Sequence, residues 1–251
     1  MIESQYGRGS TFALDLDQRE YWVTVKHILT GATHPPYGSI KSKTAQLRIL
    51  NPGGEGEEWI PRNFSVLDPG VDIDIVVLAP SEPILTDPLP NMLTDSLEFM
   101  LGGDCEFLGF PHGGGWRATF DNGKRFWMPY VKHCHVSAFT QDMNKKIWVL
   151  DGINNPGFSG GPVTFRTGSQ QKIVAVVSGY ITEPTDVVPS VPASPAKPDA
   201  RTVPKKSIGP HEPPHPKETV NLNSGFIVAF DISYAIEAIK KNPIGPLRRA
   251  K

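Results

Sequence analysis

Only two cysteines, Cys105 and Cys134, occur among the 251 residues of this chain. Secreted proteins of this size commonly rely on several disulfides, so the scarcity of cysteine favours a reducing compartment. The first ten residues, MIESQYGRGS, lack the basic start and apolar run of a secretory signal peptide. No uninterrupted apolar run approaches the roughly 18 residues that a membrane-spanning helix needs. We therefore expect a cytoplasmic protein without a membrane partner.

An excess of positive charge is also missing. Lysine and arginine number 25 against 26 aspartates and glutamates, which gives a formal net charge of -1. Proteins that bind nucleic acid usually carry a strong basic excess, so we expect no nucleic-acid partner. Proline (25) and glycine (24) are frequent, which predicts many turns and argues against a helical bundle. Hydrophobic residues make up 39% of the chain, enough for a packed core.

Short β-rich segments separated by turn residues run through most of the chain. They cover residues 11–16, 21–25, 45–50, 74–78, 104–110, 125–131, 135–139, 147–150, 162–166, 172–178 and 226–230. Strands at this spacing predict an all-β sandwich or barrels. Prolines punctuate residues 80–90, which we interpret as a linker between a domain of residues 1–90 and a second of residues 91–251.

The composition changes over residues 182–217, which hold ten of the 25 prolines and almost no aromatic residue. Such a segment cannot bury enough apolar surface to offset its loss of conformational entropy, so we predict a flexible insertion. A partner-docking role for this segment is the alternative. After it, the sequence Asp231-Ile232-Ser233 predicts the N-terminal cap of a helix over residues 234–241.

The most informative segment is NPGFSGGPV, residues 155–163. A serine hydroxyl is a weak nucleophile and needs a base, together with hydrogen-bond donors for the oxyanion that forms. Glycines on both sides of Ser159 allow a sharp turn in which successive N–H groups converge beside the hydroxyl. The same residues satisfy the Gly-x-Ser-x-Gly turn of α/β-hydrolases, but that turn requires a helix directly after the serine. Here Pro162 and a β-rich segment follow instead.

A histidine and a carboxylate that could serve Ser159 lie upstream. His27 stands at the end of the apolar segment WVTVKHIL, and Asp74 begins the apolar segment DIVVL. A carboxylate at such a buried position is costly unless it is paired, and a carboxylate can hold a histidine in the correct tautomer. Asp72, two residues earlier on the same predicted strand face, is the rival candidate, and we favour Asp74.

The order His, Asp, Ser in the motifs VTVKHIL, DIVVL and NPGFSGGPV resembles the trypsin-like serine proteases, most closely the bacterial HtrA (DegP-like) protease domain. The resemblance implies two six-stranded antiparallel Greek-key barrels and hydrolysis of peptide bonds in a protein or peptide substrate. It makes His27 the general base, Asp74 its orienting carboxylate and Ser159 the nucleophile. The N–H groups of Gly157 and Ser159 would form the oxyanion hole. The resemblance implies no metal or organic cofactor.

The resemblance also implies a substrate pocket. Ile153 falls at its base, and Ser178, Gly179 and Tyr180 fall along its wall, which predicts an uncharged, aliphatic P1 residue. Phe158 stands where many relatives have an aspartate that pairs with a newly formed N-terminus, so we expect no activation by that route. If the resemblance extends to mechanism, a protein partner or oligomerisation orders the loop of residues 154–158.

Two other interpretations remain open at this point: an esterase-type hydrolase, which the order of the residues in the chain argues against, and a catalytically idle domain. A trypsin-like domain that is catalytically idle could bind peptides or partner proteins instead of cleaving them. His133, Cys134 and His135 are potential metal ligands, but consecutive strand residues point to opposite faces, so only the two histidines could share an ion. We therefore expect no metal site.

Overall fold

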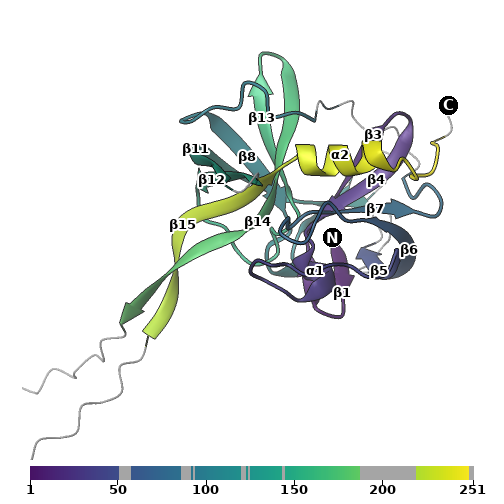
Figure 1. Ribbon diagram of the computed structural model, residues 1–251, viewed down its shortest axis with the longest axis horizontal. Helices are drawn as coiled ribbons and strands as arrows, with labels where there is room; N and C mark the ends of the chain where they lie inside the picture. The colour runs from purple at the N-terminus through teal and green to yellow at the C-terminus, as the bar shows by residue number, and fades with distance from the viewer. Residues whose placement is uncertain are drawn as a thin grey trace, which may run out of the picture.

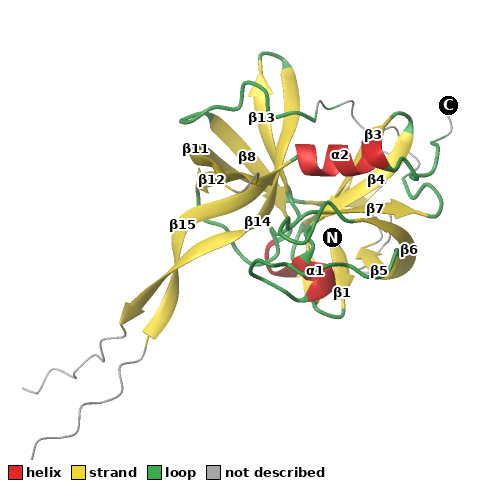
Figure 2. Ribbon diagram, in the orientation of Figure 1, coloured by secondary structure: helices red, strands yellow, loops and turns green. Residues whose placement is uncertain are grey.

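Antiparallel strands of the first half curl into one sheet (Figures 1 and 2). The computed structural model describes residues 1–50, 58–85, 92, 94–119, 123, 125–142, 145–186 and 219–248. The sheet has the strand order β2-β1-β5-β6-β7-β4-β3. Its members are β1 (Ile2–Ser4), β2 (Gly7–Gly9), β3 (Phe12–Leu16), β4 (Arg19–Thr24), β5 (Thr44–Leu50), β6 (Trp59–Leu67) and β7 (Val76–Pro80).

The second half forms a closed barrel with the strand order β11-β12-β15-β14-β13-β8. Its strands are β8 (Asp104–Gly109), β11 (Tyr130–Asp142), β12 (Lys145–Asp151), β13 (Pro162–Thr167), β14 (Gln170–Asp186) and β15 (Thr219–Asp231). A separate hairpin of β9 (Trp116–Thr119) and β10 (Arg125–Met128) follows the short 3-10 helix η1 (Pro111–Gly113). The predicted all-β fold of two antiparallel halves is confirmed, with seven strands in the first sheet where six were expected.

Two hydrophobic cores lie inside the two halves, and β14 contributes to both. Side chains of successive strand residues point to opposite faces. Accordingly, Val176 joins the core of the first half, whereas its neighbour Val177 joins the core of the second half. Both valines are fully buried. The strand therefore acts as a shared wall, which fixes the position of one half against the other.

The C-terminal helix α2 (Ser233–Lys241) packs on the first half, although it follows the last strand of the second half (Figure 2). Its apolar residues Ala235, Ile236 and Ile239 belong to the hydrophobic core of the first half. Beyond the helix, Glu20 N–H donates to the Pro246 carbonyl at 3.1 Å. The predicted helix over residues 234–241 is thus present, and it closes the first sheet.

Three local expectations need correction. His27 does not end a strand but begins the short helix α1 (His27–Thr30). Asp74 does not begin β7 but precedes it, because the strand starts at Val76. Residues 182–186, predicted to belong to a flexible insertion, continue β14, whereas residues 187–217 lie outside the described residues. The described part of the chain contains no helix long and apolar enough to cross a bilayer.

Candidate active site

His27 and Asp74 are brought together by the pairing of β4 with β7, in which Thr24 lies opposite Val76. Asp74 Oδ2 lies 2.7 Å from His27 Nδ1, and Asp74 Oδ1 accepts a hydrogen bond of 2.9 Å from the His27 backbone N–H. The Asp74 side chain is fully buried. A buried carboxylate requires partners of this kind. With the proton on Nδ1, the imidazole donates to Asp74 and leaves Nε2 as a base.

Ser178 connects this pair to Ser159. The Ser178 hydroxyl donates to Asp74 Oδ2 at 2.5 Å, and the Ser178 carbonyl accepts a hydrogen bond of 3.0 Å from Ser159 Oγ. The three predicted residues therefore meet around one residue of β14. The Ser159 hydroxyl is directed to this carbonyl and not to the His27 ring. The rival Asp72 lies elsewhere, about half exposed and 3.7 Å from the Lys145 ammonium group.

Tyr37 lies beside the Asp74–Ser178 contact. It is buried, and its ring meets that of Phe230 edge-on at 5.9 Å. Burial raises the pKa of Tyr37, and the negative charge of Asp74 raises it further. The hydrogen bond with Ser178 lowers this pKa by a smaller amount. The phenol therefore stays neutral and helps to exclude water from the carboxylate.

The loop that carries Ser159 is held by three successive carbonyl groups. The Pro156 carbonyl accepts from His112 N–H at 2.7 Å, and the Phe158 carbonyl accepts from Gly161 N–H at 2.8 Å. Between them, the Gly157 carbonyl accepts from Ser10 Oγ at 2.7 Å. In a trans peptide the N–H points away from the carbonyl of the same unit. The Gly157 N–H therefore points away from the fixed Pro156 carbonyl, and the Ser159 N–H points away from the fixed Phe158 carbonyl. The described residues supply no acceptor for either N–H.

Glycine is required at position 157. Its φ of +105° lies in a region that residues with a Cβ avoid. A Cβ at this position would clash with the Phe110 carbonyl oxygen. Both the backbone conformation at Gly157 and the close contact with Phe110 therefore require glycine in this turn.

Ser10 was not recognised from the sequence, yet all its polar groups contact this loop or its supports. Its backbone N–H donates to the Ser159 carbonyl at 2.8 Å, and its hydroxyl also accepts from Phe110 N–H at 3.0 Å. Its own carbonyl accepts from Thr24 Oγ1 at 2.8 Å. Ser10 is almost fully buried. It therefore ties the first half of the molecule to the loop that carries Ser159.

Lys132, on β11, supports the other end of the loop. Its ammonium group donates to the Ile153 carbonyl at 2.7 Å and to Asn155 Oδ1 at 2.6 Å. It also lies 5.3 Å from the centre of the Phe158 ring. Burial lowers the pKa of Lys132. Phe158 itself is fully buried and packs against Phe107 with ring centroids 4.9 Å apart.

The residues expected to form the substrate pocket are distributed differently from the expectation. The Ile153 side chain is exposed (63%), whereas its neighbour Asn154 is buried (2%). Asn154 Nδ2 donates to the Gly179 carbonyl at 3.3 Å, and its Oδ1 is buried without a hydrogen-bond partner. Tyr180 is partly exposed (37%) on the continuation of β14. Sequence reasoning did not single out Asn154, because nothing in its motif distinguishes an inward-pointing side chain from an outward-pointing one.

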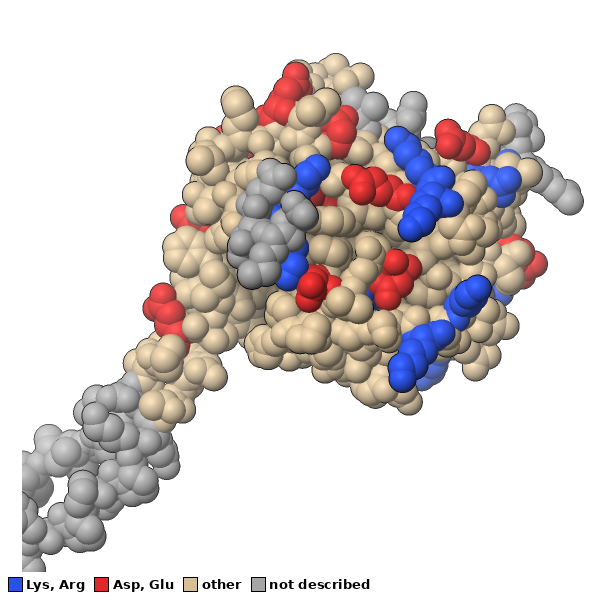
Figure 3. Space-filling model, in the orientation of Figure 1, with Lys and Arg blue, Asp and Glu red and all other residues tan. Residues whose placement is uncertain are grey.

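The histidines considered as metal ligands, His133 and His135, bind carboxylates instead. His133 and His135 form cross-strand ion pairs with Glu106 and Asp104, at 3.6 and 2.8 Å. Among the described residues there is no group of three or more potential ligands that could hold a metal ion. On the face drawn in Figure 3, basic and acidic side chains are interspersed and do not gather into one patch.

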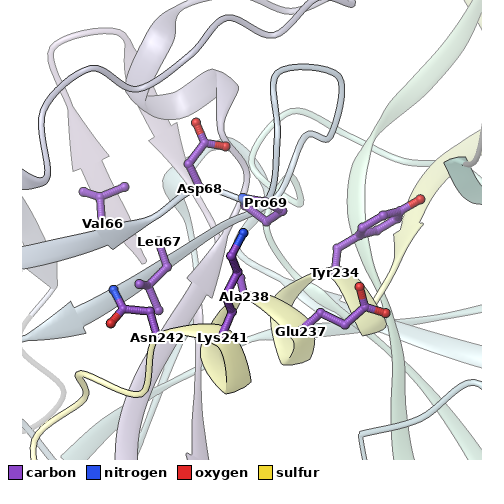
Figure 4. Close-up of a pocket in the computed structure, with 9 residues that line it drawn as sticks. All are labelled: Val66, Leu67, Asp68, Pro69, Tyr234, Glu237, Ala238, Lys241 and Asn242. Carbon is purple, nitrogen blue, oxygen red and sulfur yellow. The ribbon is translucent and has the colours of Figure 1, made fainter.

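A hollow of about 470 Å³ lies between α2 and the end of β6 (Figure 4). Its lining consists of Val66, Leu67, Asp68, Pro69, Tyr234, Glu237, Ala238, Lys241 and Asn242. Both charge signs occur in it, and none of His27, Asp74 and Ser159 lines it. It is therefore separate from the arrangement around Ser159.

No protein-family model and no curated protein matches the chain. Among solved structures, it is similar to a crystal structure of Rv3671c from M. tuberculosis H37Rv, a serine-to-alanine mutant in an inactive form. That match has a TM-score of 0.49 and 16% identity, and covers 97% of this chain and 87% of the other. A second similar structure, the Rv3671c protease in an inactive form, has a TM-score of 0.46 and 14% identity over 93% and 82% of the two chains. Similarity at this level adds no functional argument to the geometry.

Proposed function

We propose that this protein is a serine endopeptidase that cleaves peptide bonds through an acyl-enzyme. Ser159 Oγ attacks the carbonyl carbon of the substrate while His27 Nε2 takes the hydroxyl proton. His27 then gives this proton to the leaving amine, and water releases the acyl group through the same base. The free N–H groups of Gly157 and Ser159 stabilise the oxyanion in both steps.

The buried contact between Asp74 and His27 is the observation that carries this proposal. Asp74 accepts from both the ring and the backbone N–H of His27, and a third bond from Ser178 reaches the residue that binds Ser159. A carboxylate held so firmly keeps the imidazole in one tautomer and stabilises the imidazolium that forms during attack. A purely structural histidine would not need a fully buried carboxylate that is linked to a serine hydroxyl beside free N–H groups.

The finer features belong to the same proposal. None of the side chains of Ile153, Asn154, Ser178, Gly179 and Tyr180 is charged, which favours an uncharged P1 residue. The HtrA-like character, the peptide or protein substrate, cytoplasmic location and activation by a protein partner are proposed with it. A panel of peptides that differ only at P1 tests the preference, and cleavage fastest after a charged residue would contradict it.

One observation favours a second candidate, a catalytically idle domain that binds peptides. The Ser159 hydroxyl donates to the Ser178 carbonyl and not to His27, so attack requires the hydroxyl to turn toward the imidazole. Catalytic hydrogen bonds are often incomplete without substrate. The position of this hydroxyl therefore leaves the choice to experiment.

Labelling with a fluorophosphonate tests the proposal directly. In this reaction Ser159 Oγ attacks phosphorus and fluoride leaves, so intact mass measures one added phosphonyl group. We expect one adduct on the wild type and none on Ser159→Ala or His27→Ala, with all three proteins folded by circular dichroism. Cleavage of a denatured protein substrate should fall by about 10⁶ in Ser159→Ala. If the folded wild type is neither labelled nor able to cleave the substrate, the protein is better described as an idle domain or as an enzyme that still lacks its activating partner.

A further inference from the structure

Tyr37 lies in the loop between α1 and β5, and it is fixed from two sides. Its backbone N–H donates at 2.9 Å to the carbonyl of Val71, in the segment that leads to Asp74. Its ring packs edge-on against Phe230 of β15, in the core that the last strand and α2 complete. Only 6% of the residue is exposed. The position of the phenol is therefore set by the same segments that surround Asp74.

The direction of the hydrogen bond between Tyr37 and Ser178 follows from a count of protons. A serine hydroxyl carries one proton, and an ionised carboxylate can only accept. Ser178 gives its proton to Asp74 Oδ2, at 2.5 Å. In the bond with Tyr37, Ser178 Oγ must therefore accept, and the phenol O–H donates. The two bonds form a chain that runs from the phenol through Ser178 to the carboxylate.

This chain ends on the oxygen that holds the His27 ring. Asp74 Oδ2 accepts from the Ser178 hydroxyl and also lies 2.7 Å from His27 Nδ1. Hydrogen bonds that follow one another in a chain polarise and strengthen each other where water is excluded. The donor on Tyr37 thus strengthens the bond from Ser178 to Asp74, and it fixes the carboxylate oxygen that orients the imidazole.

We propose that Tyr37 is a positioning residue of the active site, whose phenol fixes Asp74 through Ser178 and so holds the His27 ring for catalysis. The inference rests on the proposed function, because the catalytic role of His27 belongs to it. Tyr37 is buried and acts through its neighbours, so it should affect kcat and not substrate binding. The loop of residues 31–43, in which no motif stood out, thereby becomes part of the support of the active site.

Tyr37→Phe tests this role, because it removes the donor and keeps the ring against Phe230. Loss of one hydrogen bond corresponds to about fivefold in rate, so kcat should fall by about fivefold with KM unchanged. Tyr21→Phe is the matched control: Tyr21 is fully buried, and its hydroxyl accepts from Gly245 N–H at 3.1 Å, in the C-terminal segment. This control should lower the unfolding temperature and leave kcat unchanged. Equal kcat values for the wild type and Tyr37→Phe would overturn the inference.

A double-mutant cycle shows whether Tyr37 acts through Ser178. Ser178→Ala removes the middle of the chain and keeps the backbone carbonyl that accepts from Ser159. Tyr37→Phe should lower kcat by about fivefold in the wild type, but by less than about twofold when Ser178→Ala is already present. The same loss in both backgrounds would contradict a chain that passes through the Ser178 hydroxyl.

Proton NMR supplies a test that does not require activity. The Nδ1 proton of His27, held by a buried carboxylate, should give a separate signal far downfield, and its exchange with water measures how firmly the pair is held. We expect exchange about fivefold faster in Tyr37→Phe than in the wild type, and unchanged in Tyr21→Phe. Equal exchange in folded wild type and Tyr37→Phe would overturn the inference. Faster exchange without any fluorophosphonate adduct would support the hydrogen-bond chain and count against the proposed function.

Discussion

The two halves of the molecule hold their parts of the candidate site by different kinds of bond. In the first half, charged side chains are buried against partners: Asp74 binds His27, and the fully buried Lys26 lies 2.5 Å from Asp68 and donates to the Gly70 carbonyl. Burial of a charge is tolerated only when such partners are present. Geometry in this half therefore depends on the identity of individual side chains.

In the second half, peptide groups are held instead. The carbonyls of Pro156, Gly157 and Phe158 are each fixed by a donor, which leaves the N–H groups of Gly157 and Ser159 without an acceptor among the described residues. Apart from the Lys132 ammonium group at the other end of this loop, the groups that hold it are uncharged, so substitutions here act mainly by allowing a peptide unit to rotate. Substitutions in the first half should therefore affect stability most, and substitutions in the second half should affect transition-state binding most.

Asp74→Asn should have the largest effect on activity. An amide can accept from only one side and favours the wrong histidine tautomer, so kcat should fall by about 10⁴. Peptide hydrolysis by the purified variant measures this loss. Asp72→Asn is the matched control and should retain nearly full activity, because Asp72 contacts Lys145 on the surface. A larger loss in Asp72→Asn than in Asp74→Asn would reverse the assignment of the carboxylate.

Lys26→Met should have the largest effect on stability. It leaves the Asp68 carboxylate and the Gly70 carbonyl without their buried partner, so the free energy of unfolding should fall by about 3 kcal/mol. Urea denaturation followed by tryptophan fluorescence measures the change. Lys172→Met in the second half is the control: its partners Asp95 and Glu98 are more exposed, so the loss should be smaller. Equal losses in the two variants would remove the contrast between the halves.

Ser10→Ala should weaken transition-state binding. Without the hydroxyl, the Gly157 carbonyl loses the bond that fixes its peptide unit, and the oxyanion hole becomes less well ordered. Removing one oxyanion donor typically costs 10²–10³ in rate, and displacement of the loop should cost about 30-fold in kcat with KM nearly unchanged. Thr24→Val removes a buried hydroxyl that bonds to the Ser10 carbonyl, so it controls for lost stability alone. Equal losses of kcat in both variants would argue against a specific role for the Ser10 hydroxyl.

Lys132→Met should have a smaller effect on the same loop. The contacts of a partly exposed ammonium group are worth about 1 kcal/mol, so we expect kcat to fall by about fivefold. Lys145→Met, which removes a surface lysine near Asp72, should leave kcat unchanged. The rate of fluorophosphonate labelling gives a second measurement that does not depend on the peptide substrate. Unchanged labelling in Lys132→Met would place the nucleophile loop beyond the influence of this residue.

The two cysteines should have no measurable reactivity in the folded protein. Cys105 and Cys134 lie opposite each other with sulfur atoms 3.2 Å apart, and both are buried. The hydrogen bond with Cys105 and then burial raise the pKa of Cys134. A raised pKa keeps the Cys134 thiol protonated, and burial shields both sulfur atoms, so iodoacetamide at pH 8 should alkylate both cysteines only in denaturant. Alkylation of the native protein would show that this core opens readily.

Local sequence patterns predicted most of the strands but not every boundary. Apolar and β-branched segments identified β4 and β12, and the glycine-rich motif identified the loop around Ser159. Strand β6 was missed because Pro61 reads as a break, although it pairs with Arg48 in the sheet. The end of β14 was missed for the same reason at Pro184. In both cases the tertiary pairing overrides what proline predicts locally.

The residues that support the site could not be predicted in the same way. Ser10 lies 147 positions before Gly157, and Lys132 lies 23 positions before Asn155. Neither stands in a motif, and their roles depend on which strands become neighbours. By contrast, His27, Asp74 and Ser159 were found because their chemistry restricts the residue types and their order in the chain. Whether they act as a catalytic triad stays a prediction until activity is measured.

The position of α2 has a consequence for how the chain acquires its structure. The hydrophobic core of the first half takes Ile232, Ala235, Ile236 and Ile239 from the end of the chain, so residues 1–85 alone leave that core incomplete. Contacts across such long sequence separations are entropically costly and form late. During synthesis, the first sheet must wait for α2 before it can reach its final packing. The nascent chain would thus stay without an ordered His27–Asp74 pair until both of its halves had been made.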